Sequence, residues 1–196
     1  MERENDMSSF FALMARMKYI ERWGLMRSLQ KENIQEHSLQ AAMIAHALAI
    51  IANQYYGGTY NADAVAVKAM YHEASEIITG DLPTPIKYYN PEIKTAYKYI
   101  EGVANEKILS LLPEGLKDTY EDIINIKNEQ EKKLVKYADR ICAYLKCVEE
   151  VNAGNREFAD AMASIREDID AIEAPEVKYF MENFASAFRL TLDKIN

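Results

Sequence analysis

Apolar residues recur along this chain at helical spacing, and the alternation that marks a strand is hard to find. Phe10, Leu13 and Met17, for example, fall on one face of a helix. We expect helices over the following ranges: Ser8 or Ser9 to about Ile20, Glu36 to about Gln54, Asn61 to about Thr79, Pro91 to about Leu112, Asn128 to about Asn152, Arg156 to Ile172 and Pro175 to Ile195, with a short helix or turns over Glu114 to Lys127. The pattern predicts an all-α bundle of about seven or more helices.

Residues that start and stop helices support these boundaries. Asn61 and Asn90 are N-cap candidates, and Pro91 suits the first helical position. Gly80 is expected just past a helix end, where a left-handed backbone costs glycine little. The prolines at positions 83 and 85 predict a stiffened turn over residues 81–85.

Length and charge exclude several classes of protein. A chain of 196 residues forms one domain or at most two small ones, and its net charge of −8 argues against a general binder of nucleic-acid polymers or membrane surfaces. The sequence shows no signal peptide and no apolar run of membrane-spanning length. Cys142 and Cys147 are poorly placed to bridge each other, so we expect reduced core thiols in a cytoplasmic protein.

Polar residues interrupt two apolar helix faces. His72 and Glu73 continue an apolar stripe, and Asp139 lies between Val135 and Cys142 on another. Burying such groups without partners is costly, so something must compensate them. For His72 and Glu73 the alternative is an ordinary helix end with solvated acids. For Asp139 the alternative is a structural ion pair with Arg140 or Lys136.

His37 completes a candidate metal-binding set with His72, Glu73 and Asp139, which we expect to come from three helices. Two imidazoles and two carboxylates suit Mn²⁺, Co²⁺, Fe²⁺ or Zn²⁺. His46 follows His37 by nine residues and points to the opposite side of the helix, so the two cannot share a metal. We expect His46 to be packed or partly exposed.

Further residues suggest what such a metal would act on. Glu76 and Asp81 are placed to take a proton from a water molecule. Arg22 and Lys87 can hold an anionic group, and Trp23 offers a flat apolar surface beside Arg22. The alternative is a tryptophan that plugs the edge of the core beside a solvated arginine. If these residues instead bind an anionic substrate beside the metal, the arrangement predicts hydrolysis of a phosphoester.

The order and spacing of His37, the His72-Glu73 doublet and Asp139 resemble the H…HD…D signature of HD-domain phosphohydrolases. The finer pattern resembles the YfbR-like 5′-deoxynucleotidases. The resemblance covers nearly the whole chain, and the stretches that carry it are Arg22 to Arg27, Glu36 to Gln40, Tyr71 to Glu76, Gly80 to Tyr88, Ala138-Asp139 and Ala143 to Cys147.

The resemblance implies a single all-helical HD-type domain over residues 1–196, in a cytoplasmic homodimer. It implies removal of phosphate from 2′-deoxyribonucleoside 5′-monophosphates with one divalent metal ion, most often Co²⁺ or Mn²⁺, with Zn²⁺, Fe²⁺ and Ni²⁺ also compatible. The implied metal ligands are His37, His72, Glu73 and Asp139, and the implied catalytic residues are Glu76 and Asp81. The implied substrate-binding residues are Arg22, Trp23, Asp81, Leu82, Pro83, Thr84 and Lys87.

One position departs from the family pattern. Glu73 stands where the family doublet has aspartate, and its side chain is one methylene longer. Metal preference and rate are therefore open at this position. Two other functions remain alternatives: hydrolysis of another nucleotide, and a catalytically silent nucleotide-binding helical protein in which Glu73 records lost chemistry.

Overall fold

The computed structural model describes residues 7–87 and 89–195, and in these ranges the fold is all-α, as predicted. Tyr88, the last residue of the Gly80 to Tyr88 stretch, lies outside the described residues. The α-helices are α1 (Phe10–Met14), α2 (Ile34–Tyr55), α3 (Ala62–Met70), α4 (Glu76–Thr79), α5 (Thr84–Lys87), α6 (Pro91–Leu109), α7 (Glu114–Ile124), α8 (Glu129–Asn152), α9 (Ala159–Asp170) and α10 (Pro175–Asn183). Short 3₁₀ segments cover Ala15–Tyr19, Arg156–Phe158, Ala185–Arg189 and Leu192–Lys194.

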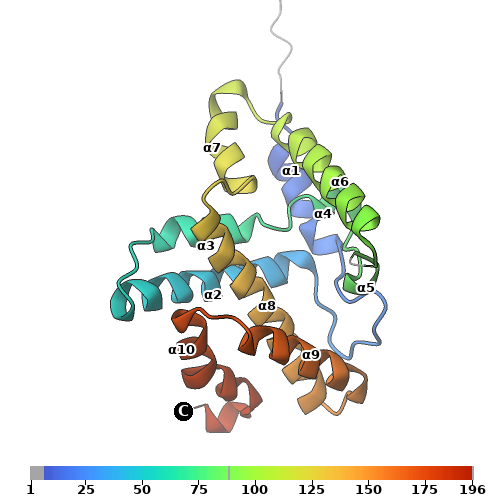
Figure 1. Ribbon diagram of the computed structural model, residues 1–196. Coiled ribbons are helices and arrows are strands. Elements are labelled where there is room, and N and C mark those ends of the chain that lie inside the picture. The colour runs from blue at the N-terminus through green and yellow to red at the C-terminus, as the bar shows by residue number, and fades with distance from the viewer. Residues whose placement is uncertain (1–6, 88, 196) are drawn as a thin grey trace, which may run out of the picture.

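Helices α2, α3 and α8 cross near the middle of the molecule, with α1, α4, α6 and α7 on one side and α9 and α10 on the other (Figure 1). The main core lies where α2 meets α3 and α8. Ala41, Ala45 and Ala49 of α2 are fully buried there, and small side chains let the neighbouring helices approach closely. The centre of the bundle is therefore rigid, which matters because α2 and α8 both carry site residues.

Asparagine caps fix the starts of several helices. Asn61 accepts a hydrogen bond from the backbone of Ala64, and Asn90 accepts one from Ile93, so both predicted caps are confirmed. Asn33 forms a capping box with Glu36, which starts α2 two residues before the predicted Glu36. This early start places His37 in the first turn of α2.

The predicted helix over Asn61 to Thr79 is wrong at its C-terminal end. Helix α3 ends at Met70, residues 71–75 form turns, and α4 begins at Glu76. The backbone N–H groups of Ala74 and Glu76 bond three residues back, which tightens the chain beyond α-helical geometry. His72 and Glu73 therefore lie on a turn, and the four metal-ligand candidates come from two helices and a turn rather than from three helices. Gly80 follows α4 at φ 73°, as expected.

Three other boundaries differ from expectation. The first helix changes to a 3₁₀ segment after Met14, and the last one stops at Asn183 instead of continuing to Ile195. The expected turn over residues 81–85 gives way to the short α5 at Thr84, because proline is tolerated in a first helical turn.

Cys142 and Cys147 are buried free thiols, as predicted, and burial raises the pKa of Cys147 to about 12. Within the described ranges, none of the helices combines the length and the apolar character that a membrane span requires.

Candidate metal centre and adjoining cavity

Four side chains converge where α2, α8 and the turn after α3 meet. His37 Nε2 lies 3.0 Å from Asp139 Oδ1, and His72 Nε2 lies 3.2 Å from Glu73 Oε1. The two pairs are close to each other, since Glu73 Oε1 is 3.9 Å from His37 Nε2. One ligand atom from each of the four residues lies within 4.8 Å of the other three. The structure thus brings together the predicted set His37, His72, Glu73 and Asp139.

The donor atoms of this cluster fit a divalent cation. His72 Nδ1 lies 2.7 Å from the carbonyl of Ala69, and a hydrogen bond there leaves the lone pair on Nε2 facing the cluster. Within the described part of the chain, His72 Nε2 and Glu73 Oε2 are buried without a hydrogen-bond partner. Buried polar atoms of this kind call for an explanation, and a cation ligated by two imidazoles and two carboxylates supplies one.

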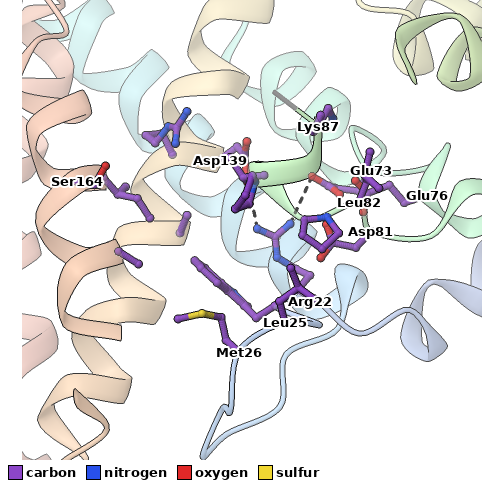
Figure 2. Close-up of a pocket in the computed structure, with 18 of the residues that line it drawn as sticks. Arg22, Leu25, Met26, Glu73, Glu76, Asp81, Leu82, Lys87, Asp139 and Ser164 are labelled. Carbon is purple, nitrogen blue, oxygen red and sulfur yellow. Dashed lines mark ion pairs between the residues drawn. The ribbon is translucent and has the colours of Figure 1, made fainter. Parts of the chain in front are cut away.

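Arg22 lies beside the cluster, on the loop that precedes α2, and links the cluster to Glu32 of the same loop. Its guanidinium is 3.5 Å from Glu73 Oε1 and 4.0 Å from Asp139 Oδ1 (Figure 2). Glu32 accepts hydrogen bonds from Arg22 Nε at 3.1 Å and from Trp23 Nε1 at 3.0 Å. Burial opposes the charge of Arg22, but the surrounding carboxylates, Glu73 foremost, raise its pKa. Arg22 therefore remains cationic beside the metal-ligand candidates.

Electrostatics divides the acids of the site into two kinds. Although burial acts in the opposite direction, His72 holds the pKa of Glu73 well below its ordinary value, and His37 lowers the pKa of Asp139 to about 2. Burial, with the charge of Glu73 beside it, raises the pKa of Glu76 to about 11. Glu73 and Asp139 are thus ready-made anionic ligands, whereas Glu76 has a high affinity for a proton.

A cavity of about 570 Å³ opens from the cluster. Every predicted catalytic and substrate-binding residue lines this cavity, together with Glu73 and Asp139: Arg22, Trp23, Glu76, Asp81, Leu82, Pro83, Thr84 and Lys87. Lys87 is already paired, because its Nζ lies 2.8 Å from Glu101 Oε1 and 4.6 Å from the ring centroid of Tyr97. Glu101 therefore neutralises part of the charge that Lys87 presents to the cavity.

The far wall of the cavity is formed by residues that sequence reasoning missed. Arg140 of α8 and Ser164 and Asp168 of α9 line it, and Arg140 Nη1 lies 3.3 Å from Asp168 Oδ2. Figure 2 shows Ser164 across the cavity from Glu76 and Asp81. Arg140, one of the two alternative partners named for Asp139, is thus engaged with another acid. No periodicity of α9 distinguishes a cavity-facing serine or aspartate from one that faces solvent.

Two remaining expectations concern Trp23 and His46. The Trp23 ring lies against Phe158, with ring centroids 5.3 Å apart, and it also lines the cavity, a position compatible with both interpretations. The solvated arginine of the core-edge alternative is wrong, because the Arg22 side chain is largely buried. His46 is partly exposed, 3.4 Å from Asp63, and outside the cluster, as expected.

Sequence reasoning also missed Glu32, which links Arg22 to Trp23, because an acid before a helix usually interacts only with the N-terminus of that helix.

The bundle and its His/His/Glu/Asp cluster define the class of HD-domain proteins. The fold is similar to an HD-domain phosphohydrolase of Listeria innocua, with a TM-score of 0.80, 22% identity and coverage of 92% of this chain and 88% of that one. It is also similar to an HD phosphohydrolase of cyanophage S-2L, with a TM-score of 0.63, 19% identity and coverage of 89% and 95%; that structure is described as bound to dA and one catalytic Zn²⁺ ion.

Sequence comparison narrows the class to one family. Residues 9–188 match the family described as 5′-deoxynucleotidase YfbR-like. A 5′-deoxynucleotidase of Vibrio vulnificus is 54% identical over 193 residues, covering 96% of this chain and 98% of the relative. One of Vibrio cholerae is 52% identical over 191 residues, with coverage of 96% and 98%. The chain belongs to the YfbR-like 5′-deoxynucleotidase family of hydrolases, which confirms the resemblance inferred from the motifs.

Proposed function

We propose that this protein is a metal-dependent 5′-deoxynucleotidase that converts 2′-deoxyribonucleoside 5′-monophosphates to deoxynucleosides and phosphate. The observation that carries the proposal is the convergence of His37, His72, Glu73 and Asp139 at one end of a cavity, with Arg22 beside them. The names of the Vibrio relatives support the substrate class.

In this proposal His37, His72, Glu73 and Asp139 hold one divalent cation, for which Co²⁺ or Mn²⁺ is our first expectation. When bound, the cation supplies Lewis-acid polarisation of a phosphoryl oxygen and makes a nearby water more acidic. The Zn²⁺ ion named for the cyanophage enzyme supports a divalent ion in a protein of this fold.

Glu76 is the proposed base, assisted by Asp81. Both carboxyl groups line the cavity, and Glu76 is buried next to the metal-ligand candidate Glu73. A base must start as the carboxylate, whereas burial and the charge of Glu73 raise the pKa of Glu76. The positive charge of a cation bound at Glu73 would lower that pKa and favour the carboxylate form that the base role requires. Asp81 is half-buried on the loop after α4, and burial raises its pKa as well, while Arg22 opposes the rise.

Arg22 and the loop after α4 are proposed to bind the nucleotide. The guanidinium of Arg22 would position the phosphate close to the metal ligands, with Lys87 contributing a second, partly neutralised charge. Trp23 would pack against the sugar and favour deoxyribose. Residues 81–84 would line the nucleotide pocket, since all four line the cavity.

The base is proposed to lie toward α9. The cavity extends from the metal-ligand cluster to Arg140, Ser164 and Asp168, and its volume of about 570 Å³ is within the range of small-ligand sites. With the phosphate at Arg22, the opposite end of the ligand reaches this wall. A donor at Arg140 beside an acceptor at Asp168 can pair with the polar edge of a base.

We further propose a cytoplasmic homodimer whose subunits each form one domain over residues 1–196. The apolar residues Leu39, Met43 and Ile50 are exposed along one face of α2, and such a face suits contact with a second subunit. Sedimentation of the purified protein tests the dimer.

The direct test is phosphate release from a panel of deoxy- and ribonucleotides with added Mn²⁺ or Co²⁺, after elemental analysis of the purified protein. We expect release from deoxynucleoside monophosphates and bound divalent metal. Release only from cyclic nucleotides or guanosine polyphosphates would favour the first alternative function. Nucleotide binding without release from any substrate would favour a catalytically silent protein.

A further inference from the structure

Residues 22–32 form a loop, here called the Arg22 loop, that carries Arg22 and Trp23 into the cavity. The loop is closed at its base, where Arg22 N donates to Glu32 O at 2.9 Å and Ile34 N donates to Ile20 O at 2.9 Å. The Glu32 side chain adds its bonds to Arg22 and Trp23. These hydrogen bonds hold the two ends of the loop together, whereas the tip of the loop is held by other contacts.

The tip is held by a buried carboxylate on α8. Glu150 is 1% exposed, and it accepts hydrogen bonds from the backbone N–H groups of Leu29 at 2.8 Å and Gln30 at 3.0 Å. Lys146, 4% exposed, balances its charge at 2.7 Å and also donates to the carbonyl of Gln30. The buried Glu150–Lys146 pair of α8 thus binds backbone N–H groups and a backbone carbonyl of the loop tip.

Two residues that follow α8 extend this attachment. Asn155 Nδ2 donates to the carbonyl of Arg27 at 2.7 Å and to Glu150 Oε2 at 2.8 Å. Glu157 accepts from the backbone N–H of Arg27 at 3.1 Å and from its Nε at 2.6 Å. Leu25 and Leu29 are largely exposed, so apolar burial contributes little to holding the tip. Polar contacts to α8 and its C-terminal extension define the loop.

We propose that Glu150 is a positioning residue for the reaction: by fixing the tip of the Arg22 loop to α8, it sets the placement of Arg22 and Trp23 in the cavity. The proposal rests on the proposed function for its kinetic consequence, since those two residues are assigned to phosphate and sugar. Glu150 itself does not line the cavity and touches no proposed ligand of the metal.

The test variant is Glu150→Gln, with Glu131→Gln as its matched control. Glu131 Oε2 pairs with the buried Lys68 at 2.6 Å, and Lys68 also pairs with Asp122 at 2.8 Å, so the control removes one carboxylate of a lysine–glutamate pair involving α8, remote from the Arg22 loop. We expect Glu150→Gln to raise the KM for a deoxynucleoside monophosphate about 10-fold, with kcat reduced less than about 3-fold, and to lower deoxyribose-over-ribose selectivity. Glu131→Gln should lower only thermal stability.

A readout independent of activity comes from Trp23, the single tryptophan of the chain. Acrylamide quenching of its fluorescence should increase in Glu150→Gln and stay at the wild-type level in Glu131→Gln. If Glu150→Gln does not fold, Asn155→Ala, which removes one attachment of the tip, takes its place with the same expectation.

The outcomes separate the two proposals. Lowered stability with unchanged KM, selectivity and Trp23 quenching would show that Glu150 is merely structural and overturn the inference. If the wild-type protein hydrolyses no nucleotide, the proposed function fails, while the quenching comparison between the two variants still decides whether Glu150 positions the loop.

Discussion

His37 and Asp139 face each other at 3.0 Å from two helices that cross in the core. Neither residue depends on a loop for its position, because α2 and α8 pack through buried alanines and large aliphatic residues. The other half of the cluster, His72 and Glu73, lies on a turn whose backbone is held by hydrogen bonds from Ala74 N to Tyr71 O and from Glu76 N to Glu73 O. The centre thus combines a pair of ligands from the core helices with a pair from a hydrogen-bonded turn.

Removing one imidazole should abolish the centre. We expect His72→Ala to lose bound metal and to lower kcat/KM at least about 100-fold, because its Nε2 has no other role among the described contacts. His46→Ala is the control, since His46 is partly exposed and outside the cluster. Elemental analysis and phosphate release measure both. Full metal content in His72→Ala would contradict the ligand assignment.

The glutamate of the doublet provides a second prediction. Glu73 Oε1 reaches within 3.9 Å of His37 Nε2 and 3.2 Å of His72 Nε2, so its carboxylate is at the cluster despite the additional methylene. Glu73→Ala should lose metal and activity, whereas Glu73→Asp should retain both. An inactive aspartate variant with full metal content would show that the two acids are not equivalent here.

Glu76 should matter for catalysis and little for metal binding. Its carboxyl lines the cavity outside the set of four ligand atoms. Glu76→Gln preserves size and removes the base, so we expect kcat to fall about 10²- to 10⁴-fold with metal content unchanged. Steady-state kinetics and elemental analysis on the same preparation provide the measurement. Loss of metal in this variant would instead make Glu76 part of the metal site.

The Glu150–Lys146 pair makes stability depend on pH. Burial acts in the opposite direction, but Lys146 and the loop N–H groups lower the pKa of Glu150 from 4.5 to about 2. Its contribution is therefore present above pH 4.5 and lost as pH falls toward 2. In urea unfolding, the stability difference between wild type and Glu150→Gln should shrink as pH falls from about 5 to about 3. A stability difference between the two proteins that stays the same at every pH would refute the assignment of a lowered pKa to Glu150.

The wall at α9 should affect base preference. Asp168→Ala removes the acceptor paired with Arg140, and Asp168 is not one of the four metal-ligand candidates. We expect relative kcat/KM values among the four deoxynucleoside monophosphates to change about 3- to 10-fold, with metal content unchanged. Asp170→Ala is the control, since Asp170 pairs with Arg166 on the same helix. Identical base profiles would place the base elsewhere.

The helical class and the ligand set could be predicted because each leaves a local trace in the sequence. Apolar spacing predicts helices, and Asp139 is recognisable as a candidate ligand because it interrupts an apolar face. The break after Met70 leaves no such trace, since His72 and Glu73 continue the apolar stripe of α3 while their backbone adopts turns. Tertiary contacts around the cluster override the local helical preference there.

Residues that act across long sequence separations could not be predicted. Glu150 and Leu29 meet only because the loop folds back on α8, and Ser164 enters the cavity wall only through the docking of α9. An aspartate or serine on a helix surface looks the same in sequence whether it faces solvent or a cavity. Knowledge of the packed bundle is needed to distinguish the two.

Trp23 has a positive φ of 61°, although glycine follows it in the chain. A bulky residue in this region costs on the order of 1 kcal/mol, and glycine or asparagine would remove most of that cost. Such a replacement would also remove the packing of the ring against Phe158 and its hydrogen bond to Glu32, which offset the backbone cost. Selection for heat tolerance and selection for sugar discrimination should therefore both favour the aromatic residue at this position.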